Sequence, residues 1–399
     1  MKNGYLSQFF DGVMAKRLSA VEANLEKSNQ HEFNGVAAMK RVFGKERRKF
    51  QTRFLYLDDD NPPISDEGFL TWYDARESHP TRSEYRLFFP TTAVSKAASA
   101  GDALFIGLRP DKSALVVIAP GTSTIASQLA WLFDIEVSDL FCVTSEFARN
   151  KINLEYTSKC ILENIGIEVD EQDSDYLEDM LIKFSGKFPS TREFSAYARS
   201  TLHGVDPRDN PDEVLMCWLN REEVLFRTLE KHLIQEQLNK GFTDVDAFIA
   251  YSLSVQNRRK SRVGQSLENH FEMILKSHNI RYDRTKVTEN RAKPDFVFPG
   301  IKEYHDINFA ASLLTMLGAK STCKDRWRQV LAEADRIACK HLLTLEPAIS
   351  IYQTDEMVSK NLQLVIPKSI HETYKLHQRN WLMDVDTFIK LLIEKQGCM

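Results

Sequence analysis

The sequence predicts a two-domain protein, with a mainly-β N-terminal domain and an α/β C-terminal domain. Short apolar segments separated by turns recur over residues 51–118, which is typical of a barrel or a sandwich. Residues 293–336 follow a strand, strand, helix pattern that favours a small α/β sheet. Residues 203–211, which lie between these regions, have the glycine, proline and Asx content of a hinge.

The composition is typical of a globular protein in a reducing compartment. The 399 residues are 43% hydrophobic and 27% charged. No apolar run approaches the ~18 residues of a membrane span, and the first residues lack a secretory signal pattern. The six cysteines have neither metal-binding spacing nor the density of a disulfide framework, so we expect a cytoplasmic protein without a membrane partner. The net charge of −4 argues mildly against indiscriminate coating of nucleic acid.

The N-terminal domain is expected to span residues 1–165. Its strand candidates are residues 51–57, 69–73, 84–89, 103–108 and 114–118. Alternation places Arg82, Glu84 and Arg86 on one face of a strand. Arginine can donate to guanine and glutamate can accept from cytosine, so this face could read a G·C-containing site. A self-neutralising, solvent-facing charged strand is the alternative interpretation.

Residues 166–212 are predicted to be a linker that contains a helix from about Ser190 through Arg199. The C-terminal domain, residues 213–399, then begins with helices predicted over residues 219–239 and 244–255. A basic run comes next, before a helix predicted over residues 265–278, and its charged members are Arg258, Arg259, Lys260 and Arg262. We expect this run to grip a nucleic-acid backbone, although a solvated basic face is the alternative interpretation.

Three residues further along the chain have the chemistry of a metal-assisted phosphodiesterase. Asp295 starts a short apolar strand, Lys320 ends the next one, and Glu333 falls on a helix predicted to follow, with Ser321 or Thr322 as its cap. Two carboxylates can hold Mg²⁺ while leaving positions for water and phosphate oxygens. A lysine offsets the charge that develops during attack on the phosphate. Taken singly, each residue is better explained as a solvated surface charge, and only the combination favours the metal site.

Two further sets of charged residues lie close to this group in the sequence. Glu268 is a candidate carboxylate just beyond the direct metal ligands, with a structural surface acid as the alternative of equal weight. Lys324, Asp325 and Arg326 follow the lysine by one helical turn. Lysine and arginine donate to guanine, and a carboxylate accepts from adjacent cytosine amino groups. This set therefore predicts recognition of a CC/GG core.

Several long motifs in this half of the chain resemble the catalytic domain of EcoRII-type restriction endonucleases. The resemblance is dense from about residue 241 to the C-terminus and thinner before it. It rests on Asn257 to Gly264, Lys293-Pro294-Asp295-Phe296, Tyr304-His305-Asp306, Lys320 to Gln329 and Glu333-Ala334-Asp335. The resemblance implies a restriction-endonuclease αβ core in which Asp295, Lys320 and Glu333 are the catalytic, metal-binding set. It also implies CCWGG or CCNGG targets whose central nucleotides are flipped out of the duplex.

The resemblance implies further roles for residues outside the catalytic set. Trp218 and Arg221 lie where a pocket for a flipped base would be built, although a helical tryptophan is more often part of a core. The N-terminal domain would be a pseudobarrel that binds a second, effector copy of the site and inhibits the nuclease until it does. Its DNA-binding residues would be His31, Arg76, Arg82, Glu84 and Arg86. Pro80 and Tyr85 depart from the basic residues expected there, which leaves the effector affinity open.

The sequence therefore predicts a magnesium-dependent type II restriction endonuclease with allosteric control by an effector site. Cleavage of both strands of a near-palindromic site requires two active sites, so we expect a homodimer. A cognate DNA methyltransferase would be its functional counterpart. Two alternatives stay open at this stage: a modification-dependent or repair nuclease with the same core, and a non-catalytic DNA-binding regulator.

Overall fold

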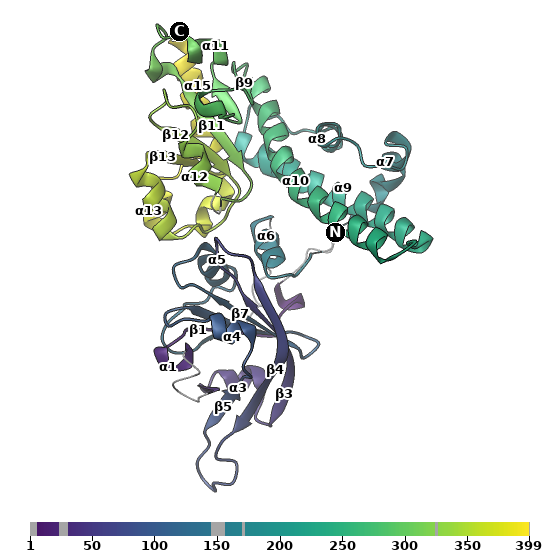
Figure 1. The fold of residues 1–399 in the computed structure, drawn as a ribbon, viewed down its shortest axis with the longest axis vertical. Coiled ribbons are helices and arrows are strands. Elements are labelled where there is room, and N and C mark those ends of the chain that lie inside the picture. Colours follow the sequence, from purple (N-terminus) through teal and green to yellow (C-terminus); the bar gives the residue numbers. More distant parts are fainter. Residues whose placement is uncertain (1–5, 24–30, 145–155, 170–171, 324–325, 399) are drawn as a thin grey trace. The chain divides into compact units, whose positions relative to one another are not determined.

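The computed structural model describes residues 6–23, 31–144, 156–169, 172–323 and 326–398. The chain forms two compact units (Figure 1). The N-terminal unit comprises residues 1–169 together with 347–354, and the C-terminal unit comprises residues 170–346 and 355–399. The boundary at residue 169 lies near the start of the predicted linker, and the predicted domain limits themselves stay a prediction. No helix of the described residues is long and apolar enough to cross a bilayer.

The N-terminal unit contains one mixed eight-stranded sheet, in the order β2-β5-β4-β3-β7-β6-β1-β8. Neighbouring strands are antiparallel except for β3 and β7, which pair in parallel. The strands are β1 (Gly12–Arg17), β2 (Glu32–Asn34), β3 (Arg48–Tyr56), β4 (Ile64–Asp74), β5 (Tyr85–Phe88), β6 (Ala103–Leu108), β7 (Ala114–Ala119) and β8 (Cys142–Thr144). All five strand candidates in this half are therefore confirmed. The pseudobarrel is confirmed only as a curled mixed sheet, because β2 and β8 remain its two edges within the described residues.

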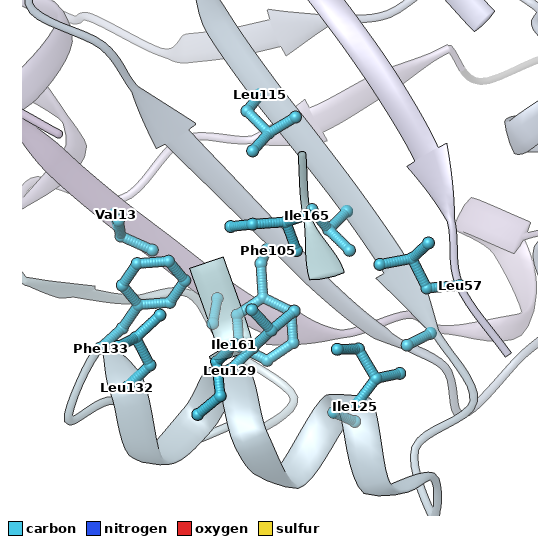
Figure 2. Packing of buried hydrophobic residues seen from close by; sticks show 14 of the residues in the cluster. Val13, Leu57, Phe105, Leu115, Ile125, Leu129, Leu132, Phe133, Ile161 and Ile165 are labelled. Atoms are coloured by element: carbon cyan, nitrogen blue, oxygen red, sulfur yellow. The ribbon is translucent and has the colours of Figure 1, made fainter. Parts of the chain in front are cut away.

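Both faces of this sheet are covered, which explains why β6 and β7 are buried at every position. Phe105 and Val117 face one apolar cluster, whereas Ile106 and Val116 face the other. Figure 2 shows the first cluster, where side chains of α5 (Thr124–Leu132) and α6 (Tyr156–Asn164) pack on the strands. The other described helices of the unit are α1 (Ala20–Ala23), α3 (Met39–Phe43) and α4 (Ala93–Ala97).

The C-terminal unit contains a five-stranded sheet in the order β13-β12-β11-β10-β9. Its strands are β9 (Asp283–Arg284), β10 (Phe296–Phe298), β11 (Thr315–Lys320), β12 (Lys340–Thr344) and β13 (Leu362–Val365). β11, β12 and β13 are parallel, and β9 and β10 run antiparallel to their neighbours. Phe271 of α10 (Val245–Ser277) and Phe388 of α15 (Val385–Gly397) pack with the aromatic residues of β10, so the predicted α/β organisation is confirmed.

The C-terminal unit also has long helices, and some of its helices pack around a second apolar core. α9 (Pro211–Lys240) begins at Asn210, whose side chain accepts from the amide of Glu213, and ends at Gly241 with φ 77°. α8 (Thr191–Ser200) has a capping box between Ser190 and Glu193, which confirms the helix predicted there. The remaining helices of four or more residues are α7 (Leu177–Lys183), α11 (Ile301–His305), α12 (Arg326–Leu331), α13 (Ile351–Ser359) and α14 (Leu376–Arg379), besides a 3-10 turn over Lys368–Thr373. The predicted linker therefore includes two helices, α7 and α8, that pack on α9 around Phe194 and Phe226.

Three helix predictions are wrong in their extent. The helices predicted over residues 244–255 and 265–278 form one continuous helix, α10, that includes the basic run. The helix predicted to carry Glu333 ends at Leu331, and its described part begins at Arg326.

Candidate active site

Asp295 and Lys320 meet at one end of the C-terminal sheet. Antiparallel pairing of Phe296 with Leu317 places Asp295, which precedes β10, beside the last residues of β11. The Ala319 amide and the Lys320 Nζ donate to the same oxygen, Asp295 Oδ2, at 2.7 and 2.8 Å. Their side chains are 15% (Asp295) and 21% (Lys320) exposed, so the ion pair lies partly out of water and still opens to the surface. The structure thus brings together the first two residues of the predicted set.

Glu333 completes this group from an irregular turn. It lies two residues beyond the end of α12, and its amide donates to Val330 O at 3.1 Å. Burial, followed by the negative charge of Asp295, raises the pKa of the Glu333 carboxyl to about 7, and Lys320 acts in the opposite direction. Glu333 Oε2 is buried without a hydrogen-bond partner. A buried carboxylate oxygen without a donor is costly unless a cation or a proton satisfies it.

Glu268 of α10 is a fourth charged member of the site. Burial and the Asp295 charge raise its pKa, and the guanidinium of Arg284 lowers it. Arg284 lies on β9 and donates to Glu268 Oε2 and to Glu272 Oε2, each at 2.6 Å. Glu268 is therefore close to the catalytic candidates and is fixed by an arginine, and its role as an outer carboxylate stays a prediction.

The residues fit a hard divalent cation. Asp295 and Glu333 offer carboxylate oxygens, and one oxygen of Glu333 has no other partner. Magnesium is typically bound through one or two carboxylates, with water and phosphate oxygens at its other positions. Among the described residues, no three His, Cys, Asp or Glu side chains form a group that could hold a metal ion.

We expect Glu333→Gln to change the pH dependence of stability in the metal-free protein. The pKa of Glu333 rises from 4.5 to about 7 on folding, so the folded protein keeps a proton between these pH values that the unfolded chain has lost. Stability should therefore fall as pH rises through this window and level off above it. The variant should lack this fall and be more stable than wild type at pH 8 by roughly 1 kcal/mol, discounted for partial exposure.

Urea denaturation with EDTA at pH 5.5 and pH 8 measures this effect. The exposed Glu394→Gln in α15 is the matched control, and it should follow the wild-type pH profile. An equal pH dependence in Glu333→Gln and wild type would show that Glu333 is not protonated in the fold.

The predicted base-reading set is described only in part. Lys324 and Asp325 lie outside the described residues. Arg326 is the first described residue of α12 and is exposed. Its predicted contact with bases stays a prediction.

The basic run has a different role from the predicted one at two of its four positions. Arg262 is only 6% exposed and pairs with Glu222 and Glu223 of α9. Arg259 donates to the buried Glu230 at 2.8 Å. Arg262 therefore joins two helices, contrary to the prediction that it contacts DNA. Arg258 stacks on Phe188 and is half-buried, whereas Lys260 is exposed.

The predicted pocket for a flipped base is filled by protein. Trp218 is 5% exposed and packs against His270, with the Arg199 guanidinium over its ring. Arg221 donates to Asp173 at 2.7 Å and to Thr201 at 2.8 Å. Trp218 is a core residue, which is the alternative that a helical tryptophan favours, and the pocket prediction is wrong for it.

The predicted effector residues are mostly joined by ion pairs in the N-terminal unit. Glu84 pairs with both Arg76 (2.6 Å) and Arg86 (2.7 Å). Arg86 also donates to Glu32 at 2.7 Å, and Glu32 accepts from the Tyr73 hydroxyl as well. His31 is half-buried beside Phe88 and Phe89.

Arg82 departs from the predicted arrangement. β5 begins only at Tyr85, so Arg82 is an exposed loop residue and does not share a strand face with Glu84 and Arg86. Its amide donates to His79 Nδ1 at 3.1 Å, which turns the chain before the strand.

Sequence patterns missed Arg284, Glu272, Glu32 and Lys340, all of which support functional candidates. Arg284 lies in a two-residue strand, too short for alternation to reveal. Glu32 precedes Arg86 by 54 residues, and only the pairing of β2 with β5 brings them together. Such contacts depend on sheet order, which local patterns do not give.

The acid before β10, the lysine at the end of β11 and the second acid after α12 thus lie near one another in the C-terminal unit. Residues 226–389 match the family model described as EcoRII C terminal. The resemblance predicted from the sequence is thereby confirmed.

Two curated relatives share this likeness. Over 204 residues the chain is 44% identical to type II restriction enzyme EcoRII of Escherichia coli, a match that covers 51% of this chain and 50% of that protein. Over 215 residues it is 23% identical to type II restriction enzyme SsoII of Shigella sonnei, covering 47% of this chain and 69% of that protein. The match thus spans about half the length of the first relative.

Solved structures also resemble this chain. Metal-depleted Ecl18kI in complex with uncleaved, modified DNA aligns with a TM-score of 0.47 at 18% identity, covering 57% of this chain and 86% of that one. The restriction endonuclease PspGI–substrate DNA complex aligns with a TM-score of 0.41 at 14% identity, covering 60% of this chain and 96% of that one.

Proposed function

We propose that this protein is a magnesium-dependent type II restriction endonuclease that hydrolyses double-stranded DNA at a CC/GG-containing site of the CCWGG or CCNGG kind. The observation that carries the proposal is the meeting of Asp295, Lys320 and Glu333 at one sheet end. Lys320 is bonded to Asp295, and Glu333 has a buried oxygen that lacks a donor. The 44% identity to EcoRII over half of the chain supports the same reaction.

Each residue of the site has a definite task in this proposal. Asp295 and Glu333 hold Mg²⁺, which when bound supplies Lewis-acid stabilisation and a more acidic water. Lys320 Nζ neutralises the developing charge on the attacked phosphate and orients the nucleophilic water. The Ala319 amide and Lys320 keep the Asp295 carboxylate fixed while the substrate enters. Glu268, held by Arg284, supplies a further negative charge close to the metal ligands.

Digestion of a plasmid of known sequence with Mg²⁺ tests this function directly. We expect discrete fragments whose ends, once sequenced, share a CC/GG core, and no cleavage when EDTA replaces the metal. Random nicking, or cleavage that persists in EDTA, would contradict the proposal. Methylated and unmethylated plasmids run in parallel distinguish a modification-dependent nuclease, which would require the methylated DNA.

DNA contacts near the scissile bond are assigned to accessible residues of the basic run and of the predicted base-reading set. Arg258 and Lys260 would contact the backbone, and Arg326 would contact bases together with Lys324 and Asp325. A homodimer would place one active site on each strand of a near-palindromic site. A methyltransferase that modifies the same site would be its functional counterpart.

The N-terminal unit is proposed to bind an effector copy of the site. Arg76, Glu84 and Arg86 form a connected set on and beside β5 whose side chains are about one-third to one-half exposed: 46% for Arg76, 32% for Glu84 and 37% for Arg86. An arginine side chain that is already held by ion pairs loses less conformational entropy when it contacts a base edge. Such a pre-ordered set suits recognition of guanine and cytosine in the major groove.

Arg86→Ala should weaken effector binding. Removing one bidentate contact to guanine should cost about 1–3 kcal/mol of discrimination, so a plasmid with two sites should lose its rate advantage over a plasmid with one. Cleavage rates of the two plasmids measure this. Lys112→Ala, which removes a surface ion pair to Asp11 elsewhere in the unit, is the control and should preserve the advantage. An unchanged two-site advantage in Arg86→Ala would remove Arg86 from the effector face.

A further inference from the structure

The turn that carries Glu333 has a conformation that needs support. Glu333 lies outside any helix, and the next residue, Ala334, has φ 53°, in the left-handed region that alanine rarely adopts. Ala334 is fully buried. A non-glycine residue held in this region persists only where its surroundings enforce the conformation.

Lys340 packs against this turn. It is the first residue of β12 and is 8% exposed. Its Nζ donates to Ala334 O at 3.3 Å and to Ile337 O at 2.9 Å, on either side of the chain reversal. Burial lowers the pKa of Lys340, and the carboxylates of Asp335, Glu289 and Glu333 act in the opposite direction. A buried ammonium is tolerated because it has these acceptors and counter-charges.

Other bonds fasten the outer residues of the same turn. The Asp335 amide donates to Glu289 Oε2 at 3.2 Å, and the Tyr304 hydroxyl donates to the same oxygen. The Arg336 guanidinium donates to the carbonyl oxygens of Asp306 and Phe309 at 3.0 and 2.9 Å. The turn is thus tied to Glu289 through Asp335, to the loop after α11 through Arg336, and to β12 through Lys340.

We propose that Lys340 is a positioning residue for Glu333: its ammonium group holds the turn of residues 333–337 in the shape that presents the Glu333 carboxylate beside Asp295 and Lys320. This inference rests on the proposed function, because the position matters through the metal that Glu333 would hold. Lys340 itself does not touch the reacting atoms.

Two effects of Lys340 on metal affinity oppose each other. A positive charge near a metal ligand repels the incoming cation and lowers the metal affinity. A turn that is already fixed raises the affinity, because metal binding does not have to order the ligand. The ammonium is bonded to two carbonyl oxygens, and the negative charges of Asp335 and Glu289 offset part of its field. Ordering therefore dominates, and loss of Lys340 should weaken metal binding rather than strengthen it.

Lys340→Met in the full chain tests the inference. Without metal, we expect amide hydrogen exchange of residues 332–338 to speed up about tenfold, as a loss of about 1.4 kcal/mol of local stability would produce. With DNA, the Mg²⁺ concentration for half-maximal cleavage should rise about 10–100-fold, as for other residues that orient a metal ligand. Maximal rate should recover at high Mg²⁺, and KM for DNA should stay unchanged.

Lys395→Met is the matched control. Lys395 is also a partly buried lysine whose Nζ donates to a backbone carbonyl, Leu314 O at 3.1 Å, and to Thr315 Oγ1 at 3.0 Å, at the opposite end of β11 from Lys320. This variant should leave exchange at residues 332–338 and the Mg²⁺ requirement unchanged. If Lys340→Met does not fold, Lys340→Gln, which stays polar but loses the charge and is one bond shorter, replaces it and should change exchange and the Mg²⁺ requirement in the same direction.

Unchanged exchange in the turn, or a Mg²⁺ requirement equal to or lower than that of wild type, would overturn the role of Lys340. Calorimetric titration of the DNA-free protein with Mg²⁺ supplies the affinity independently of cleavage. If wild type does not cleave DNA at all, the proposed function fails, and the exchange and titration results still decide whether Lys340 positions Glu333.

Discussion

Lys320→Ala should abolish DNA cleavage while leaving the protein folded and able to bind its site. Lys320 Nζ is 2.8 Å from Asp295 Oδ2 at the surface end of β11, where it can reach a phosphate. Removing a preorganised positive group from a developing oxyanion should lower the rate about a thousandfold or more. Asp295 retains the Ala319 amide as a donor, so its carboxylate stays bonded in the variant.

Time courses of plasmid cleavage at saturating Mg²⁺ measure the rate, and fluorescence anisotropy with a labelled duplex measures binding. Lys302→Ala, which removes an exposed lysine of α11, is the control and should cleave at the wild-type rate. Cleavage by Lys320→Ala within tenfold of wild type would refute the assignment of the active site.

The strands were accessible to prediction because their burial follows a local pattern. β6 and β7 are continuous apolar runs bounded by polar turns. This pattern is typical of strands that are covered on both faces of a sheet. Asp295 and Lys320 were placed correctly at the ends of β10 and β11 for the same reason. Once two strands pair, residues at their ends are brought together by register alone.

The errors have a common physical cause, which is pairing between residues distant in sequence. The basic run seemed to interrupt a helix because four cations in six residues suit a solvated loop. Arg259 and Arg262 are instead neutralised by Glu230, Glu222 and Glu223 of α9, 29 to 40 residues earlier. Nothing in the local pattern indicates such partners.

Glu333 shows the same limit inside the active site. Its residue type and rough position followed from the chemistry and from the resemblance, whereas its local conformation did not. A lysine seven residues later and a glutamate on a distant 3-10 turn fasten the chain around it. Helix propensity alone would have continued α12 through this position.

Arg262→Ala should strongly destabilise the protein. A large loss of stability would indicate that Arg262 has a structural role, whereas its sequence context suggested a DNA contact. The guanidinium is buried between α9 and α10, lies over the Phe226 ring at 4.2 Å, and pairs with Glu222 and Glu223. Glu222 is fully buried and also lies 2.9 Å from His270 Nε2. Removing the arginine leaves buried carboxylate charge with less compensation, and such losses cost about 3–5 kcal/mol.

Urea denaturation of Arg262→Ala, followed by circular dichroism, measures this loss. Lys260→Ala is the matched control, because Lys260 is exposed on the same helix two residues earlier and its truncation should change stability by less than about 0.5 kcal/mol. Lys260→Ala should instead lower DNA affinity and reduce its salt dependence by about one phosphate contact. If Arg262→Ala were as stable as wild type and weakened DNA binding as Lys260→Ala does, the helix-joining role would be wrong. The basic run would then be a DNA contact at both positions, because a guanidinium that supports the fold cannot be removed without a loss of stability.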